Sequence, residues 1–162
     1  MAWREDASFG VVRAHRVHMR DNVVSTTSTA LTLNPQAHAG RTILINSNST
    51  VANTFTLPAA SGTGNVYTLV NNIAQTQGTV VVAAAGTDVV SGIAMNFGTT
   101  EETAMAFRTS ATSDKISLNL TTTGGGVGGD KVVAKDVASG TWLVEVIQMG
   151  SGSLVILFFV IV

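Results

Sequence analysis

The chain has 162 residues and a net charge of −1, with 45% hydrophobic and only 12% charged residues. Its length fits one domain, or one domain with an arm, and so little charge predicts that part of the surface contacts protein rather than water. The near-neutral charge argues against a general nucleic-acid-binding protein, and the absence of cysteine excludes disulfides, thiolate metal sites and cysteine nucleophiles.

The first segment, residues 1–29, is predicted to be a basic, extended arm. Residues 1–20 hold four basic and two acidic side chains, which gives +2, whereas residues 21–162 hold five basic and eight acidic ones, which gives −3. The apolar residues of the arm follow neither a helical nor a strand period. The segment also lacks the apolar core of a secretory signal, so we expect the protein to be made and used inside a cell.

Residues 30–150 are predicted to form an all-β body. Short β-branched runs alternate with Gly, Asn, Ser, Asp and Pro, which is typical of many short strands with frequent turns. The expected architecture is a β-sandwich or β-barrel-like body of short antiparallel strands. The expected strands are Ala30–Leu33, Arg41–Ile45, Thr54–Leu57, Val66–Asn71, Thr79–Ala83, Asp88–Ile93, Ala104–Arg108, Lys115–Leu120, Lys131–Ala134 and Thr141–Gln148.

The strand Thr141–Gln148 is apolar on both faces. Trp142, Val144 and Val146 alternate along one face, whereas Leu143 and Ile147 flank a glutamate on the other. A strand that is apolar on both sides needs a covering layer on each side, and a neighbouring subunit is one source of the second layer. We therefore predict that Leu143 and Ile147 lie in a subunit interface.

The C-terminal segment, residues 151–162, contains nine consecutive apolar residues from Leu154 to Val162. A helix of this length rises only about 14 Å, roughly half the thickness of the hydrocarbon layer of a membrane. As a strand without polar alternation, the segment must be covered on both faces. We expect it to be part of an oligomer core, with these interface residues: Leu154, Ile156, Phe158, Phe159 and Val160.

No catalytic, cofactor or metal site is predicted. The glycine-rich run Thr121–Asp130 lacks the Gly-Lys-Ser/Thr ending of a phosphate loop and leads into a strand rather than a helix. His15, His18 and His38 lack a carboxylate cluster that would complete a metal site, and we expect them to be solvated. The neighbouring carboxylates Glu101 and Glu102 would point to opposite faces of a strand.

Several turn motifs carry a family resemblance. They occur in this order: Thr56–Tyr67 (TLPAASGTGNVY), Ala85–Asp88 (AGTD), Ser113–Asn119 (SDKISLN), Thr121–Asp130 (TTTGGGVGGD) and Ala138–Trp142 (ASGTW). In these segments, which span about residues 54–148, the chain resembles the small decoration, cement or head-fibre proteins of tailed bacteriophages.

The resemblance implies a non-enzymatic structural protein that forms a homotrimer and binds the outside of an icosahedral shell, with the major capsid protein as partner. It would place the protein on the capsid exterior of the virion, made in the bacterial cytoplasm, with no cofactor, direct nucleic-acid contact or membrane. Within the basic arm, Arg13, Arg16 and Arg20 are the expected capsid contacts, because arginine suits carboxylate partners. The alternative is a tail-fibre or spike module that binds a host-surface glycan.

Overall fold

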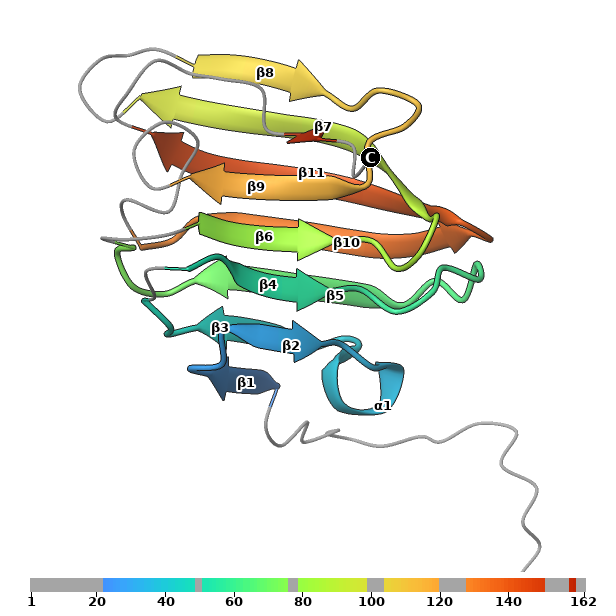
Figure 1. The fold of residues 1–162 in the computed structure, drawn as a ribbon, viewed down its shortest axis with the longest axis horizontal. Coiled ribbons are helices and arrows are strands. Elements are labelled where there is room, and N and C mark those ends of the chain that lie inside the picture. Colours follow the sequence, from blue (N-terminus) through green and yellow to red (C-terminus); the bar gives the residue numbers. More distant parts are fainter. Residues whose placement is uncertain are drawn as a thin grey trace, which may run out of the picture.

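The computed structural model describes residues 22–48, 51–75, 79–98, 104–119, 128–150 and 158–159. In these residues the chain forms two mixed β-sheets and one four-residue helix, so the predicted all-β class is confirmed (Figure 1). No helix of the described residues is long and apolar enough to cross a membrane.

The two sheets contain twelve strands within the residues that the structure describes. The seven-stranded sheet has the order β1 (Val23–Thr26), β3 (Thr42–Ile45), β5 (Val66–Asn71), β10 (Lys131–Ala138), β11 (Thr141–Gly150), β7 (Val89–Gly98) and β8 (Ala104–Arg108). The five-stranded sheet has the order β12 (Phe158–Phe159), β9 (Lys115–Asn119), β6 (Thr79–Ala83), β4 (Asn53–Thr56) and β2 (Ala30–Thr32). The helix α1 spans Pro35–His38.

The prediction that the strands are antiparallel is wrong for half of the pairings. β1–β3, β3–β5, β2–β4, β4–β6 and β7–β11 are parallel. The reason is the path of the chain, because β1 to β6 alternate between the two sheets and return to the same sheet in the same direction. Local hairpins, such as the one between β10 and β11, supply antiparallel pairs.

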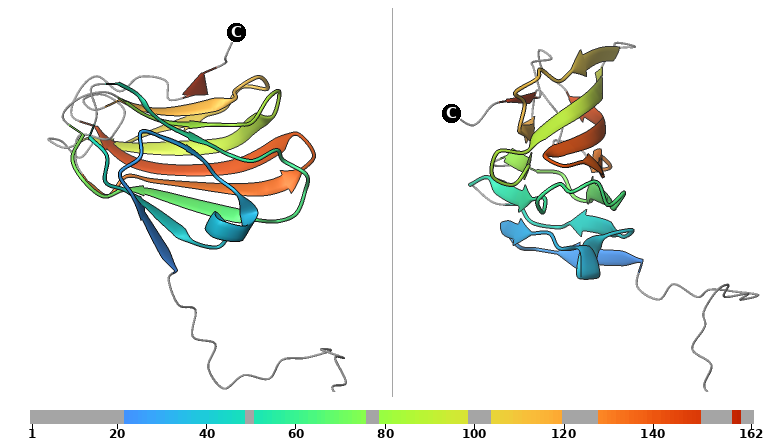
Figure 2. Two further views of the ribbon diagram at one scale, coloured as in Figure 1. Left: turned by 60° about the horizontal axis from the view of Figure 1, so that its bottom comes forward. Right: turned by 90° about the vertical axis from the view of Figure 1, so that its right-hand side faces the viewer.

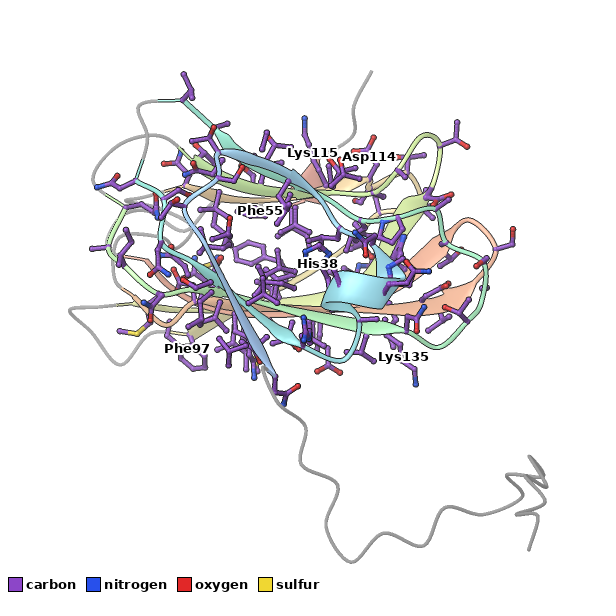
Figure 3. All side chains as sticks on the ribbon, turned by 90° about the horizontal axis from the view of Figure 1, so that it is seen from below. His38, Phe55, Phe97, Asp114, Lys115 and Lys135 are labelled. Atoms are coloured by element: carbon purple, nitrogen blue, oxygen red, sulfur yellow. The ribbon has the colours of Figure 1, made fainter. Side chains whose placement is uncertain are left out.

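The two sheets lie face to face and enclose a common core (Figure 2). Strand alternation sends every second side chain inward, as in β5 and β11, where buried residues alternate with more exposed ones. The largest buried side chains are Trp142, Tyr67 and Phe55. The first two meet edge to face with ring centroids 5.6 Å apart, and Phe55 lies between the two layers in Figure 3.

The body begins earlier than residue 30. β1 lies within residues 1–29, the range expected to be an arm, and it pairs with β3 of the body. β7 also continues beyond the expected end at Ile93 to Gly98. The expectation that His38 is solvated is wrong. Its side chain is buried, and its Nδ1 atom accepts a hydrogen bond from the backbone N–H of Asn34, which closes the turn around α1.

Parallel pairing of β7 with β11 depends on a close approach at Gly92. A Cβ atom at this position would overlap the backbone carbonyl of Val144 on β11. Glycine therefore allows these two long strands to pair over their whole length. Their pairing sets the positions of the outward side chains on both strands.

Candidate functional site: the outer face of the seven-stranded sheet

The outer face of the seven-stranded sheet is unusually apolar. Within the described residues, ten large hydrophobic side chains are exposed, and six of them lie on this face in two neighbouring strands. These six are Ile93, Met95 and Phe97 on β7, and Leu143, Ile147 and Met149 on β11. We call the outward surface formed by β7, β11, β10 and β5 the apolar outer face.

The register of the parallel strands places these side chains side by side. Ile147 pairs with Met95, and Met149 pairs with Phe97. Ile93 pairs with Glu145 and is 54% exposed, the largest exposed fraction of the six. The apolar surface continues across β10 and β5 through half-buried valines that also point outward: Val133, Val66 and Val70.

Two shallow hollows indent this face on either side of Glu145. One of about 70 Å³ is lined by Ile93, Met95, Lys131, Glu145, Val146 and Ile147. The other, of about 110 Å³, is lined by Val66, Val133, Lys135, Leu143 and Glu145. Hollows of this size between protruding aliphatic side chains suit the insertion of side chains from another protein surface.

Charged groups on the face are few and close together. Glu145 on β11 pairs with Val133 on β10, and Lys131 and Lys135 are the diagonal neighbours on either side of that valine. Within the described residues, no ion pair joins Glu145 to either lysine. We call these three residues the Glu145 cluster.

The outer face of the five-stranded sheet is different. Its outward positions are mainly threonine and other polar residues, namely Thr54 and Thr56 on β4, Thr79 on β6, Thr32 on β2, and Lys115, Ser117 and Asn119 on β9. The apolar outward residues of these strands are Ala30, Val81 and Ala83, which are smaller than the leucine, isoleucine, methionine and phenylalanine of the opposite face. We call this surface the polar outer face. Figure 3 shows Lys115 on this side of the body, and Phe97 and Lys135 on the opposite side. One surface of the body therefore resembles an ordinary solvated surface, and the other does not.

The predicted interface residues fall in two groups. Leu143 and Ile147 lie together on the apolar outer face, 43% and 39% exposed. Among the described residues, only the core of the body covers the strand that carries them, on its inner side. Phe158 and Phe159 form β12, which pairs with β9 at the edge of the five-stranded sheet.

The remaining predicted contact residues lie outside the described residues: Arg13, Arg16 and Arg20 of the arm, and Leu154, Ile156 and Val160 of the C-terminal segment. The contribution of β7 was not predicted. Its alternation of Ile93, Met95 and Phe97 with Ala94 and Asn96 was a usable signal, but the expected strand ended at Ile93.

Four of the five turn motifs that carry the resemblance meet at one end of the body and have a structural role, whereas the described part of the fifth, residues 128–130, lies at the other end of β10. The carboxylate of Asp136 accepts hydrogen bonds from the backbone N–H groups of Ser61, Gly62 and Thr63 at 3.0, 2.7 and 3.0 Å, and from Thr63 Oγ1 at 2.6 Å. The N–H of Ala60 donates to Asp88 Oδ2 at 2.6 Å. These motifs therefore fasten the loop before β5 to the β10–β11 hairpin and to the start of β7.

Burial raises the pKa of the Asp136 carboxyl, but the four hydrogen bonds from Thr63, Gly62 and Ser61 outweigh this effect and leave the pKa below its ordinary value. Burial, with a smaller contribution from the negative charge of Asp136, raises the pKa of the Tyr67 hydroxyl. Asp136 is therefore an ionised structural group at neutral pH.

The described residues give little support for a metal site or for a catalytic site built on carboxylates. No group of three or more histidine, cysteine, aspartate or glutamate side chains there could hold a metal ion. Asp130, at the end of the glycine-rich run, accepts a hydrogen bond from the backbone N–H of Met149 at 2.8 Å and so helps to hold β11 in place. Glu101 and Glu102 lie outside the described residues.

Gln148 is expected to limit the stability of the fold. Its side chain is 1% exposed, and within the described part of the chain neither polar atom of its amide has a hydrogen-bond partner. Because a buried polar group without a partner costs about 1–3 kcal/mol, Gln148→Met should raise the free energy of unfolding by about 1–2 kcal/mol. Urea unfolding at a fixed protein concentration measures the change.

Gln75 provides the matched control, because it is also buried but its amide is used. Its Nε2 donates to the carbonyl of Ser47 and to Asn71 Oδ1, and its Oε1 accepts from Asn53 Nδ2. Gln75→Met should therefore destabilise the fold. A Gln148→Met protein that loses as much stability as Gln75→Met would contradict the assignment of Gln148 as an unsatisfied group.

Comparisons of the chain with protein-family models, with curated proteins and with solved structures returned no significant match. The resemblance noted above therefore rests on the turn motifs alone.

Proposed function

We propose that this chain is a structural decoration, or cement, protein of a bacteriophage head, which self-associates as a trimer and binds the outer surface of the shell. The observation that carries the proposal is the difference between the two outer faces of the body. A two-layered β-protein that worked alone in water would have polar residues on both outer faces, with apolar residues confined to the interior.

The proposed activity is binding itself. A decoration protein adds contact area across the joints between shell subunits and so resists internal pressure from packaged DNA. Covering a large apolar side chain contributes about 1.5–3 kcal/mol relative to leaving it in water, so six such side chains provide an ample driving force even though each is already partly buried. The low proportion of charged residues in the chain also suits a protein whose surface is largely in contact with other proteins.

Glycan binding, the alternative, is less well supported by the described residues. Sugar sites commonly set an aromatic ring beside polar groups, but Tyr67 and Trp142 are both buried in the core. Phe97 is exposed, and it lies among methionine and aliphatic side chains rather than beside polar groups. These surroundings suit a protein surface better than a sugar.

Imaging of virus particles tests the proposal. Shells that lack the protein should gain density at three-fold or quasi-three-fold positions of the head after incubation with the purified chain. Density at the tail tip would support the glycan-binding alternative, and particles that acquire no density at all would contradict attachment to the virion. Replacing Arg13, Arg16 and Arg20 by serine in the same assay should weaken binding and reduce its dependence on salt.

A further inference from the structure

The apolar outer face requires an occupant, and three observations identify it. The first is its size. Its four strands, about 4.8 Å apart and six to ten residues long at about 3.3 Å per residue, span roughly 19 Å by 20–33 Å, on the order of 500 Å². A stable interface takes about 800 Å² from each partner, so this face supplies more than half of such an interface and the flanking strands of the same sheet can supply the rest. The whole face, rather than one pocket on it, is therefore suited to another folded surface.

The second observation is the Glu145 cluster. A partner that covers this face takes the carboxylate of Glu145 out of water, and it must supply a cation, because an unpaired buried charge is strongly unfavourable. A lysine that the partner also covers needs an acceptor from that partner. The face itself carries both kinds of group, one carboxylate between two ammonium groups, so another copy of it can pair each Glu145 with one lysine, while the long side chain of the second lysine extends to water at the rim.

The third observation is the shape of the face, on which side chains protrude beside hollows. Ile93 and Leu143 protrude beside hollows of about 70 and 110 Å³ that border Glu145 on its two sides. A second copy offers aliphatic side chains of the right kind to fill the hollows, and it offers hollows to receive Ile93 and Leu143. Side chains that fill well-packed, desolvated pockets near the centre of an interface carry most of its binding energy.

We infer that a second copy of this chain covers the apolar outer face, with Glu145 of one copy against Lys131 or Lys135 of the next. The inference rests on the proposed function, since it names the surface through which the proposed self-association takes place. In a closed ring of three copies, each apolar outer face meets the faces of both neighbours, so every Glu145 can meet a lysine of the following copy. The polar outer face and the arm are then left free for water and for the shell.

Charge reversal tests this assignment. Glu145→Lys gives a face with three positive groups, and the double change Lys131→Glu with Lys135→Glu gives a face with three negative groups. Each variant alone should self-associate at least about 100-fold more weakly than the unaltered chain, because like charges meet in a desolvated interface. An equimolar mixture of the two should associate again, and 1 M salt should weaken that association. Sedimentation equilibrium measures all of these quantities.

Lys115→Glu on the polar outer face is the matched control, and it should leave the association constant unchanged. Two variants that remain associated like the unaltered chain would overturn the inference while leaving self-association, and so the proposed function, intact. Two variants that are monomeric alone and stay monomeric when mixed would overturn the Glu145–lysine pairing.

Binding to shells is measured in parallel, so that the two proposals can fail separately. An unaltered chain that is monomeric in solution, with charge variants that lose shell binding, would show that a shell protein covers the face, which overturns the inference but not the decoration role. A chain that associates through the Glu145 cluster but never binds a shell would leave the inference standing and contradict the decoration role.

Discussion

Aspartate at both Leu143 and Ile147 is expected to abolish the proposed self-association and to leave the chain monomeric. Both side chains project from β11 on the apolar outer face, where Ile147 pairs with Met95 and Leu143 borders a hollow. The double change removes two apolar anchors and places two carboxylates without partners in the interface. Because anchor truncation alone commonly costs 2 kcal/mol or more per residue, association should weaken by at least about 1,000-fold.

The fold should survive this change, because both side chains are exposed within one chain and the core on the other side of β11 is untouched. Circular dichroism and light scattering at micromolar concentration therefore test the prediction together. A matched control places aspartate at Thr54 and Ser117 on the polar outer face, where no loss of association is expected. A folded Leu143→Asp/Ile147→Asp protein that keeps the mass of the unaltered chain would disprove a role for this face in self-association.

The strands of the body could be predicted from the sequence because each is a local pattern. Lys115–Asn119 alternates apolar and polar residues, and Thr54–Thr56 precedes a proline that cannot donate to a β-ladder. The pairing could not be predicted in the same way. Whether β7 lies beside β11 depends on contacts between segments far apart in the sequence, and the glycine that permits the pairing, Gly92, looks like any other turn signal.

Only the β11 part of the candidate site could be predicted, because the sequence shows the pattern within a strand but not which strand lies beside it. Leu143 and Ile147 could be identified because β11 is apolar on both faces, which is unusual for a strand with one face at the surface. The neighbouring Ile93, Met95 and Phe97 could be assigned to the same surface only once the register between β7 and β11 was known. A one-residue shift in that register would have sent these three side chains to the core.

The turn motifs suggested a family resemblance in the sequence, and in the structure their described residues stabilise the fold. Asp136 shows why such a turn requires particular residues. It lies inward at the end of β10, where the register with β11 shifts, and its carboxylate collects three backbone N–H groups and one hydroxyl from residues 61–63. Gly62 sits in the left-handed region of φ, which lets consecutive N–H groups converge on one carboxylate.

Asp136→Ala is accordingly expected to reduce the free energy of unfolding by about 3–5 kcal/mol at neutral pH, because it leaves several backbone donors without their charged acceptor. The side chain is 3% exposed, so water cannot easily replace the carboxylate. The loss should depend on pH. Since the pKa of Asp136 is lowered by folding, its stabilising contribution is fully present above the unfolded pKa of about 3.9 and is lost as pH falls through the lower folded value.

The difference in stability between the unaltered chain and Asp136→Asn should therefore be largest near neutral pH and shrink below about pH 4. Urea unfolding of both proteins from pH 7 to pH 3 measures it, and Asp88→Asn serves as a control, because Asp88 accepts from one backbone N–H of the same loop rather than from three. The Asp88 change should cost less at pH 7. A difference for Asp136→Asn that stayed constant down to pH 3 would show that the loop does not hold the carboxylate ionised, and that packing alone maintains the conformation of these motifs.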